Sequence, residues 1–205
     1  MRSLVGLATV LLLLAACRVA PDIRISNTTI PTLKGQAASF DNIDVDQKAH
    51  RLYVADRTDL GVDVFDIKSA QPTFVTTVGL PASPNGLAVA PDLQRVFAGL
   101  SDGSVAIIET EATTPTFLRA VQTGGKEADL LDYAAAGHQV FASNGIDDTI
   151  TMLDGSSGAV TNHLKVGYAL EQPRYNSADG LLYVTSPDAG ALFALDPNSG
   201  AIRKK

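Results

Sequence analysis

The chain has 205 residues, of which 45% are hydrophobic and 19% charged. This composition is typical of a folded protein and excludes a disordered chain. The 22 acidic residues outnumber the 16 basic ones, and the formal net charge is −6. An acidic surface repels phosphate backbones, so we expect no nucleic-acid partner.

The first element that the sequence predicts is a targeting segment, residues 1–16. Arg2 supplies a positive charge, and residues 5–14 form an apolar stretch too short to span a bilayer comfortably. Leu14-Ala15-Ala16-Cys17 then matches a bacterial lipobox. We therefore expect a lipoprotein signal peptide that is removed before Cys17, which would carry the lipid. The alternative is an ordinary secretory signal in which Cys17 is incidental.

Cys17 is the only cysteine, so the mature chain can hold no intrachain disulfide and no cysteine-ligated zinc. Residues 17–39 are expected to form a lipid-anchored N-terminal segment. Arg18 is not the aspartate that retains lipoproteins at the inner membrane of enteric bacteria. These features predict a protein of the cell envelope, held by its lipid in the outer membrane and facing the periplasm.

Two short strand patterns then repeat four times along the chain. RLYVAD at 51–56 recurs as RVFAGL at 95–100, QVFASN at 139–144 and LLYVTS at 181–186, at steps of 44, 44 and 42 residues. A second run follows each of them: VDVFD, VAIIE, ITMLD and LFALD. A period in the low forties with several strands per unit predicts an all-β fold, a β-propeller of four-stranded antiparallel blades. We expect blades at about 40–79, 80–122, 123–166 and 167–205. The aromatic of each repeat, Tyr53, Phe97, Phe141 and Tyr183, is expected to be buried between neighbouring sheets.

The repeat motifs resemble a known family. PNGLAVAPD at 84–92, LYVAD, LYVTS and the following V-x-V-x-D strand are similar to the YVTN repeat of YncE-like bacterial propeller proteins. That resemblance implies a ring that usually has seven blades, whereas four are visible here. The chain could be a truncated product, the segment at 22–30 could lend a strand to close a smaller ring, or two chains could pair.

One position carries an oxygen-bearing side chain in every repeat. Twelve residues before the repeat aromatics Tyr53, Phe97, Phe141 and Tyr183 stand Asp41, Asn85, Asp129 and Glu171. Oxygen ligands that converge from several strands suit Ca²⁺, and a ring of like charge is costly unless a cation neutralises it. We predict a calcium site at one mouth of the central channel. The alternative is that these residues cap strand ends and accept backbone hydrogen bonds.

Further candidates for ligand binding lie slightly nearer the aromatics. Asp44, Asp132 and Arg174 stand nine residues before them, and Tyr133 and Tyr175 stand eight before. No Ser/His/Asp or metal-binding spacing accompanies the three histidines.

Two classes of function follow from these patterns. The first is a non-catalytic propeller, attached to the membrane by its N-terminal lipid, that binds a protein, peptide or glycan or serves as a scaffold. The second is a metal-dependent hydrolase of the lactonase type that uses the acidic channel mouth. The hydrolase requires a general base beside the metal, and only Asp44 and Asp132 could take that role.

Overall fold

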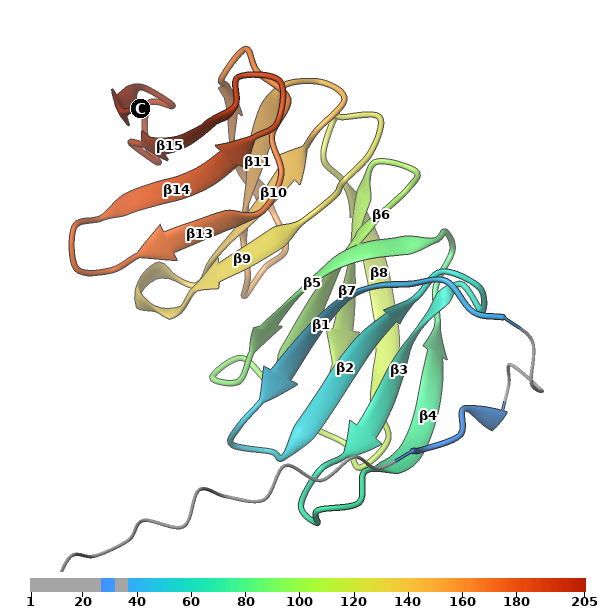
Figure 1. Cartoon of the computed structure of the whole chain (residues 1–205). Coiled ribbons are helices and arrows are strands. Elements are labelled where there is room, and N and C mark those ends of the chain that lie inside the picture. Colours follow the sequence, from blue (N-terminus) through green and yellow to red (C-terminus); the bar gives the residue numbers. More distant parts are fainter. Residues whose placement is uncertain (1–26, 32–36) are drawn as a thin grey trace, which may run out of the picture.

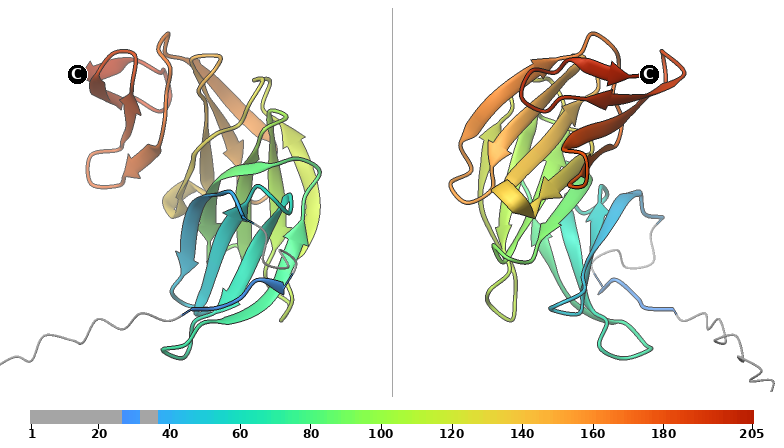
Figure 2. Two further views of the ribbon diagram at one scale, coloured as in Figure 1. Left: turned by 45° about the vertical axis from the view of Figure 1, so that its right-hand side comes forward. Right: turned by 90° about the vertical axis from the view of Figure 1, so that its left-hand side faces the viewer.

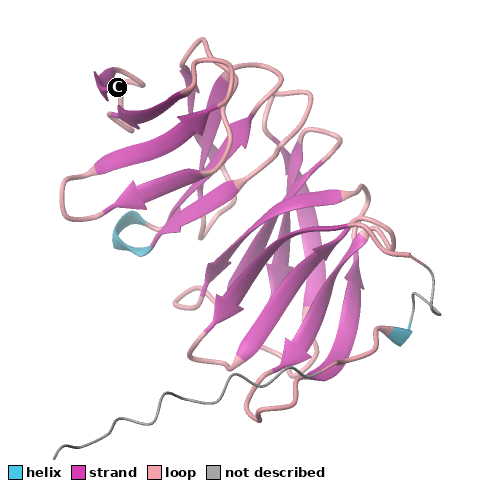
Figure 3. Ribbon diagram, viewed as in Figure 1, coloured by secondary structure: helices cyan, strands magenta, loops and turns pink. Residues whose placement is uncertain are grey.

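The structure is a computed structural model that describes residues 27–31 and 37–205. The targeting segment and Cys17 lie outside the described residues. Of the segment at 22–30, residues 27–30 are described and form no strand. Figure 3 shows that the described chain consists almost entirely of strands and turns, with short 3-10 segments at residue 31 and at Ala135–Gly137 (η2). None of its helical segments is long and apolar enough to cross a bilayer.

The strands form four separate antiparallel sheets, each made of four consecutive strands (Figure 1). Blade 1 contains β1 (Phe40–Asp46), β2 (Arg51–Asp56), β3 (Gly61–Asp66) and β4 (Thr73–Gly79). Blade 2 contains β5 (Pro84–Ala90), β6 (Arg95–Leu100), β7 (Ser104–Glu109) and β8 (Thr116–Gln122). Blade 3 contains β9 (Leu131–Ala134), β10 (Gln139–Asn144), β11 (Thr149–Asp154) and β12 (Val160–Lys165). Blade 4 contains β13 (Pro173–Asn176), β14 (Leu181–Ser186), β15 (Ala191–Leu195) and β16 (Ile202–Lys204). The predicted fold of four propeller blades is confirmed.

Acidic residues at the ends of the third strands shape the turns to the fourth strands. Asp66, Asp154 and Asp196 each accept a backbone N–H from a residue two or three positions later, at 2.9, 2.6 and 2.9 Å. Such contacts are the usual reason for Asp in turns, because the short side chain reaches its own backbone.

Alternating side chains fill the junctions between blades. Tyr53 of blade 1 lies in one apolar cluster with Val96 and Ala98 of blade 2. Phe97 of blade 2 lies with Leu131 and Val140 of blade 3, and Phe141 of blade 3 with Leu182 and Val184 of blade 4. These three aromatics are at most 1% exposed. Residues two apart in a strand share a face, so each sheet uses one face for the preceding blade and the other for the next.

Tyr183 is the exception among the repeat aromatics. We expected it to be buried like the other three, but it is only partly buried and its hydroxyl donates to Asp179 at 2.7 Å. The prediction was wrong for Tyr183 because no fifth blade covers this face in the described chain. Figure 2 shows the reason: the blades form an arc that is open between blade 1 and blade 4.

Candidate functional site

The predicted acidic residues lie where the inner strands begin, at one end of the blades that we call the channel mouth. Asp41 lies in β1 between the irregular register positions Phe40 and Ile43, and Asn85 in β5 between Pro84 and Leu87. Asp129 and Glu171 precede β9 and β13 and donate their backbone N–H to Ser143 and Thr185, at 2.8 and 3.0 Å. The equivalent position thus lies at a local irregularity of the ladder in blades 1 and 2, and just before the strand in blades 3 and 4. Bulges of this kind re-aim side chains at the rims of sheets.

Arg57, which the sequence analysis did not select, connects the residues of the mouth. It follows the last residue of β2, and its Nη2 forms an ion pair with Asp41 and donates to Asn85 Oδ1 at 2.7 Å. The Asn85 side chain is 1% exposed and donates through Nδ2 to Glu127 Oε1 at 3.0 Å and to the Ala128 carbonyl at 3.1 Å. One chain of polar contacts therefore runs from blade 1 through blade 2 to the segment that enters blade 3.

The carboxylates of the mouth are close enough to repel one another. Burial, followed by the negative charges of Glu171, Glu127 and Asp41, raises the pKa of Asp129 to about 6, against the opposing charge of Arg57. The charges of Glu171, Glu127 and Asp41 thus act on Asp129, and the guanidinium of Arg57 opposes them.

The mouth has no preformed set of metal ligands. Among the described residues, no group of three or more His, Cys, Asp or Glu side chains is placed to hold a metal ion. Asn85 is one of the four residues that we assigned to Ca²⁺, and its Oδ1 already accepts the hydrogen bond from Arg57. The calcium site stays a prediction, and in this structure Arg57 provides positive charge at the mouth.

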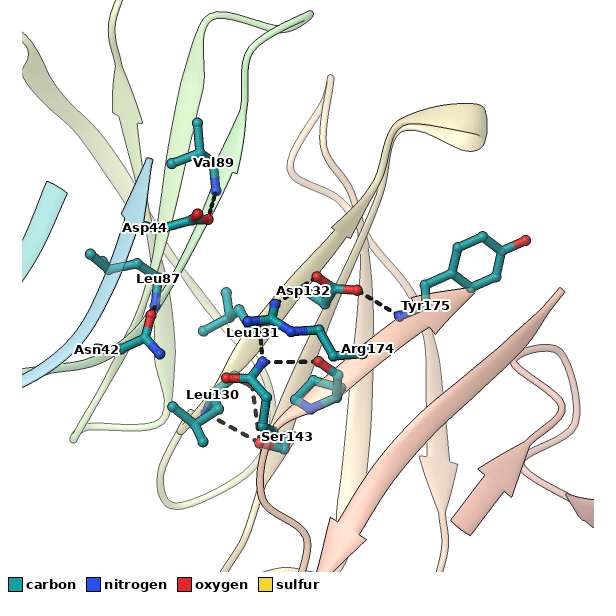
Figure 4. A network of polar contacts seen from close by, with 12 residues as sticks. Asn42, Asp44, Leu87, Val89, Leu130, Leu131, Asp132, Ser143, Arg174 and Tyr175 are labelled. Atoms are coloured by element: carbon teal, nitrogen blue, oxygen red, sulfur yellow. Dashed lines mark hydrogen bonds and ion pairs between the residues drawn. The ribbon is translucent and has the colours of Figure 1, made fainter. Parts of the chain in front are cut away.

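Asp44 and Asp132 hold neighbouring inner strands together (Figure 4). Asp44 accepts the backbone N–H of Val89 in the next blade at 2.8 Å, and its second oxygen accepts its neighbour Val45 N–H at 2.7 Å. Asp132 accepts the Tyr175 N–H at 2.6 Å and the Arg174 guanidinium at 2.9 Å. Each aspartate therefore joins its own blade to the next one.

Tyr133 and Tyr175, our candidates for stacking on a ligand, lie against the repeat aromatics. The ring of Tyr133 stacks on Phe97 with centroids 6.4 Å apart, and Tyr175 stacks on Phe141 at 5.7 Å. The Tyr133 hydroxyl donates to Asp92 at 2.9 Å. The pKa of Tyr133 is raised mainly by burial of the hydroxyl and, to a smaller extent, by this hydrogen bond. Both rings pack within blade junctions.

A second polar cluster lies at the opposite end of the blades from the mouth. His138 Nδ1 lies 3.0 Å from Ser156 Oγ, and His138 Nε2 lies 3.4 Å from Asp92 Oδ2. A serine nucleophile also needs backbone donors for a developing oxyanion. The N–H groups of residues 157, 158 and 159 are all used inside the turn, by Asp154 and Ser157. These three backbone groups are therefore not free to stabilise an oxyanion.

The comparisons with known proteins agree with the fold. No protein-family profile matches the chain, and no curated protein matches it. A solved structure of Kuenenia stuttgartiensis hydrazine synthase, a β-propeller protein, is similar over 80% of this chain and 47% of its own, with a TM-score of 0.69 and 14% sequence identity. The chain therefore spans about half the length of that protein. At this identity the similarity shows the fold alone: the chain is a β-propeller protein.

Proposed function

We propose that the chain is a non-catalytic binding or scaffold propeller of the bacterial cell envelope, related to the YVTN repeat family. Its N-terminal lipid on Cys17 attaches it to the outer membrane, where it faces the periplasm. The observation that supports a non-catalytic role is that Asp44 and Asp132 form hydrogen bonds between neighbouring blades. Each has both carboxylate oxygens engaged, and each accepts a backbone N–H of the next blade.

A general base must be able to reach a proton of water or substrate. Asp44 and Asp132 were the only candidates for this role in a hydrolase. A carboxylate whose two oxygens both accept hydrogen bonds must give up one of these contacts before it can take a proton from water or substrate. Taking either aspartate for proton transfer would also break a contact between blades. The arrangement therefore favours binding over metal-dependent hydrolysis, which is the alternative.

The channel mouth is the proposed binding face. Glu171 is exposed and Glu127 is partly exposed, and both add negative charge beside Asp129. A ligand with a positive group, such as a lysine side chain of a protein or peptide, would relieve this repulsion. A glycan would use the same oxygens through its hydroxyl groups.

The two classes of function can be separated with the purified chain. We expect no turnover of a panel of lactones, with or without added Ca²⁺. We expect a fluorescent lysine-containing peptide to bind more tightly than its acetyl-lysine analogue, with an affinity that falls as salt rises. The double variant Glu127→Gln/Glu171→Gln should lose this preference. The double variant Glu109→Gln/Glu111→Gln, with the same charge change at the opposite end of the blades, should keep it. Lactone turnover that requires Ca²⁺ and disappears in Asp129→Asn would establish the hydrolase instead.

A further inference from the structure

Blade 4 has a free face that resembles the buried face of the other blades. Tyr183, Leu192, Ala194 and Lys204 lie on this face, which bears an open groove of about 600 Å³. Tyr183 is paired with Ala194 across β14 and β15, and Ala194 is paired with Lys204 across β15 and β16. The Leu192 side chain is 54% exposed.

The same register occurs in the three closed junctions. Tyr53 is paired with Val64, Phe97 with Ile107 and Phe141 with Met152. In blades 1 to 3 these pairs are covered by the following blade. The face of blade 4 is therefore one half of a blade junction, and the described chain supplies no blade to cover it.

Blade 1 carries the other half of such a junction. The faces that blades 2, 3 and 4 turn toward their preceding blades contain Val96 with Ala98, Val140 with Ala142, and Leu182 with Val184. The equivalent residues of blade 1 are Leu52 and Val54, which line a groove of about 240 Å³ together with Phe40, Phe65 and Ile30. Phe40 is 45% exposed.

The two faces also differ in their polar residues. The alternation of β2 and β3 places Asp56 and Asp63 on the same face of blade 1 as Leu52 and Val54. Both aspartates are 0% exposed, and each has one carboxylate oxygen that no donor of the described residues reaches. Lys204 and Lys205 line the groove of blade 4, so a junction between the faces combines basic groups of blade 4 with buried acidic groups of blade 1.

We propose that a second copy of this chain covers both faces, with blade 4 of each copy packed against blade 1 of the other. The two identical junctions would close a ring of eight blades with twofold symmetry. Propellers have about four to eight blades, so this ring lies within the known range. Twofold dimers are the commonest symmetric assemblies, and closure leaves neither apolar face exposed to solvent. This inference stands apart from the proposed function, because the channel mouth exists in each copy.

The test is sedimentation equilibrium of the full chain in a density-matched detergent. We expect the wild-type protein to have twice the chain mass. Leu192→Arg places a charge on the free face of blade 4, and Phe40→Arg places one on the free face of blade 1. Each variant alone should sediment as one chain. Leu118→Arg is the matched control, because Leu118 lies on β8 and is 45% exposed, away from both faces; it should stay a dimer.

Mixing the two monomeric variants tests whether blade 4 of one copy packs against blade 1 of the other. In a mixture, blade 4 of Phe40→Arg meets blade 1 of Leu192→Arg with both faces intact, so one junction is restored and a dimer should form. Circular dichroism and unfolding midpoints matching those of Leu118→Arg would show that the variants are folded. A monomeric wild-type chain would overturn the proposal, as would species larger than two chains or a Phe40→Arg protein that stays dimeric.

Discussion

At the scale of single residues, the charge of Asp129 is the most costly one at the channel mouth. Burial and the charge of Glu171 raise its pKa from 3.8 to about 6. Between these values the folded chain binds a proton that the unfolded chain releases, so the free energy of unfolding falls as pH rises through this window and is constant above it. Asp129→Asn should therefore increase this free energy by about 1 kcal/mol at pH 8, after allowance for solvent screening, and leave it unchanged at pH 3.5.

Urea unfolding at the two pH values checks this prediction. Asp63 shares the same window, because burial also raises its pKa to about 6. Part of the pH dependence should therefore persist in Asp129→Asn and disappear in the double variant with Asp63→Asn. An Asp129→Asn protein that is less stable than wild type at pH 8 would show that the carboxylate is stabilised by contacts beyond those described.

Asp132 offers a second residue-scale prediction, on the bond between blades 3 and 4. Asp132→Ala should lower the free energy of unfolding by roughly 1–3 kcal/mol, because the Tyr175 N–H loses its acceptor. Arg174→Ala should cost under about 1 kcal/mol, since the guanidinium side chain is 59% exposed and its ion pair is screened. Equal losses in the two variants, measured by urea unfolding, would assign the stability to the ion pair instead of the backbone contact.

Counting along the repeats selected equivalent positions in or just before the inner strands, but it did not identify the partners of these residues. Arg57 could have been found, because the equivalent residues Ser101, Gly145 and Pro187 carry no charge. That its guanidinium reaches both Asp41 and Asn85 depends on how two blades pack, which no local pattern encodes. The same applies to Asp44 and Asp132, whose acceptor role requires the neighbouring blade.

At the scale of elements, the alternation of residues along each strand predicts which side chains share a face of the sheet. It does not predict whether a neighbouring blade covers that face. The prediction that follows is a contrast between two aromatics at one repeat position. Phe141→Ala should lower the free energy of unfolding by roughly 3–5 kcal/mol, because the ring is fully enclosed between two blades. Tyr183→Ala should cost only about 1 kcal/mol at concentrations where the chain is monomeric. Losses of equal size would mean that the Tyr183 face is covered within one chain.

At the scale of the whole molecule, the repeat count predicted four blades but could not predict closure. Closure depends on the angle between successive blades and on whether the last face meets the first. These quantities arise from the packing of whole sheets, and the repeat motifs are nearly the same in open and closed arrangements. The arc is open at blade 4, where Leu192 is 54% exposed and Tyr183 is only partly buried.

Attachment to the membrane is the last prediction, and it concerns the entire chain. The lipobox predicts that Cys17 carries the anchor, and a single acyl chain of myristoyl length would hold the protein only weakly. Cys17→Ala should abolish incorporation of labelled palmitate, leave the unprocessed precursor and remove the protein from the detergent phase on Triton X-114 partitioning. Ser3→Ala, a change within the signal segment but outside the lipobox, should leave both properties intact. Normal processing of Cys17→Ala to a soluble product would identify an ordinary secretory signal and free the propeller from the membrane.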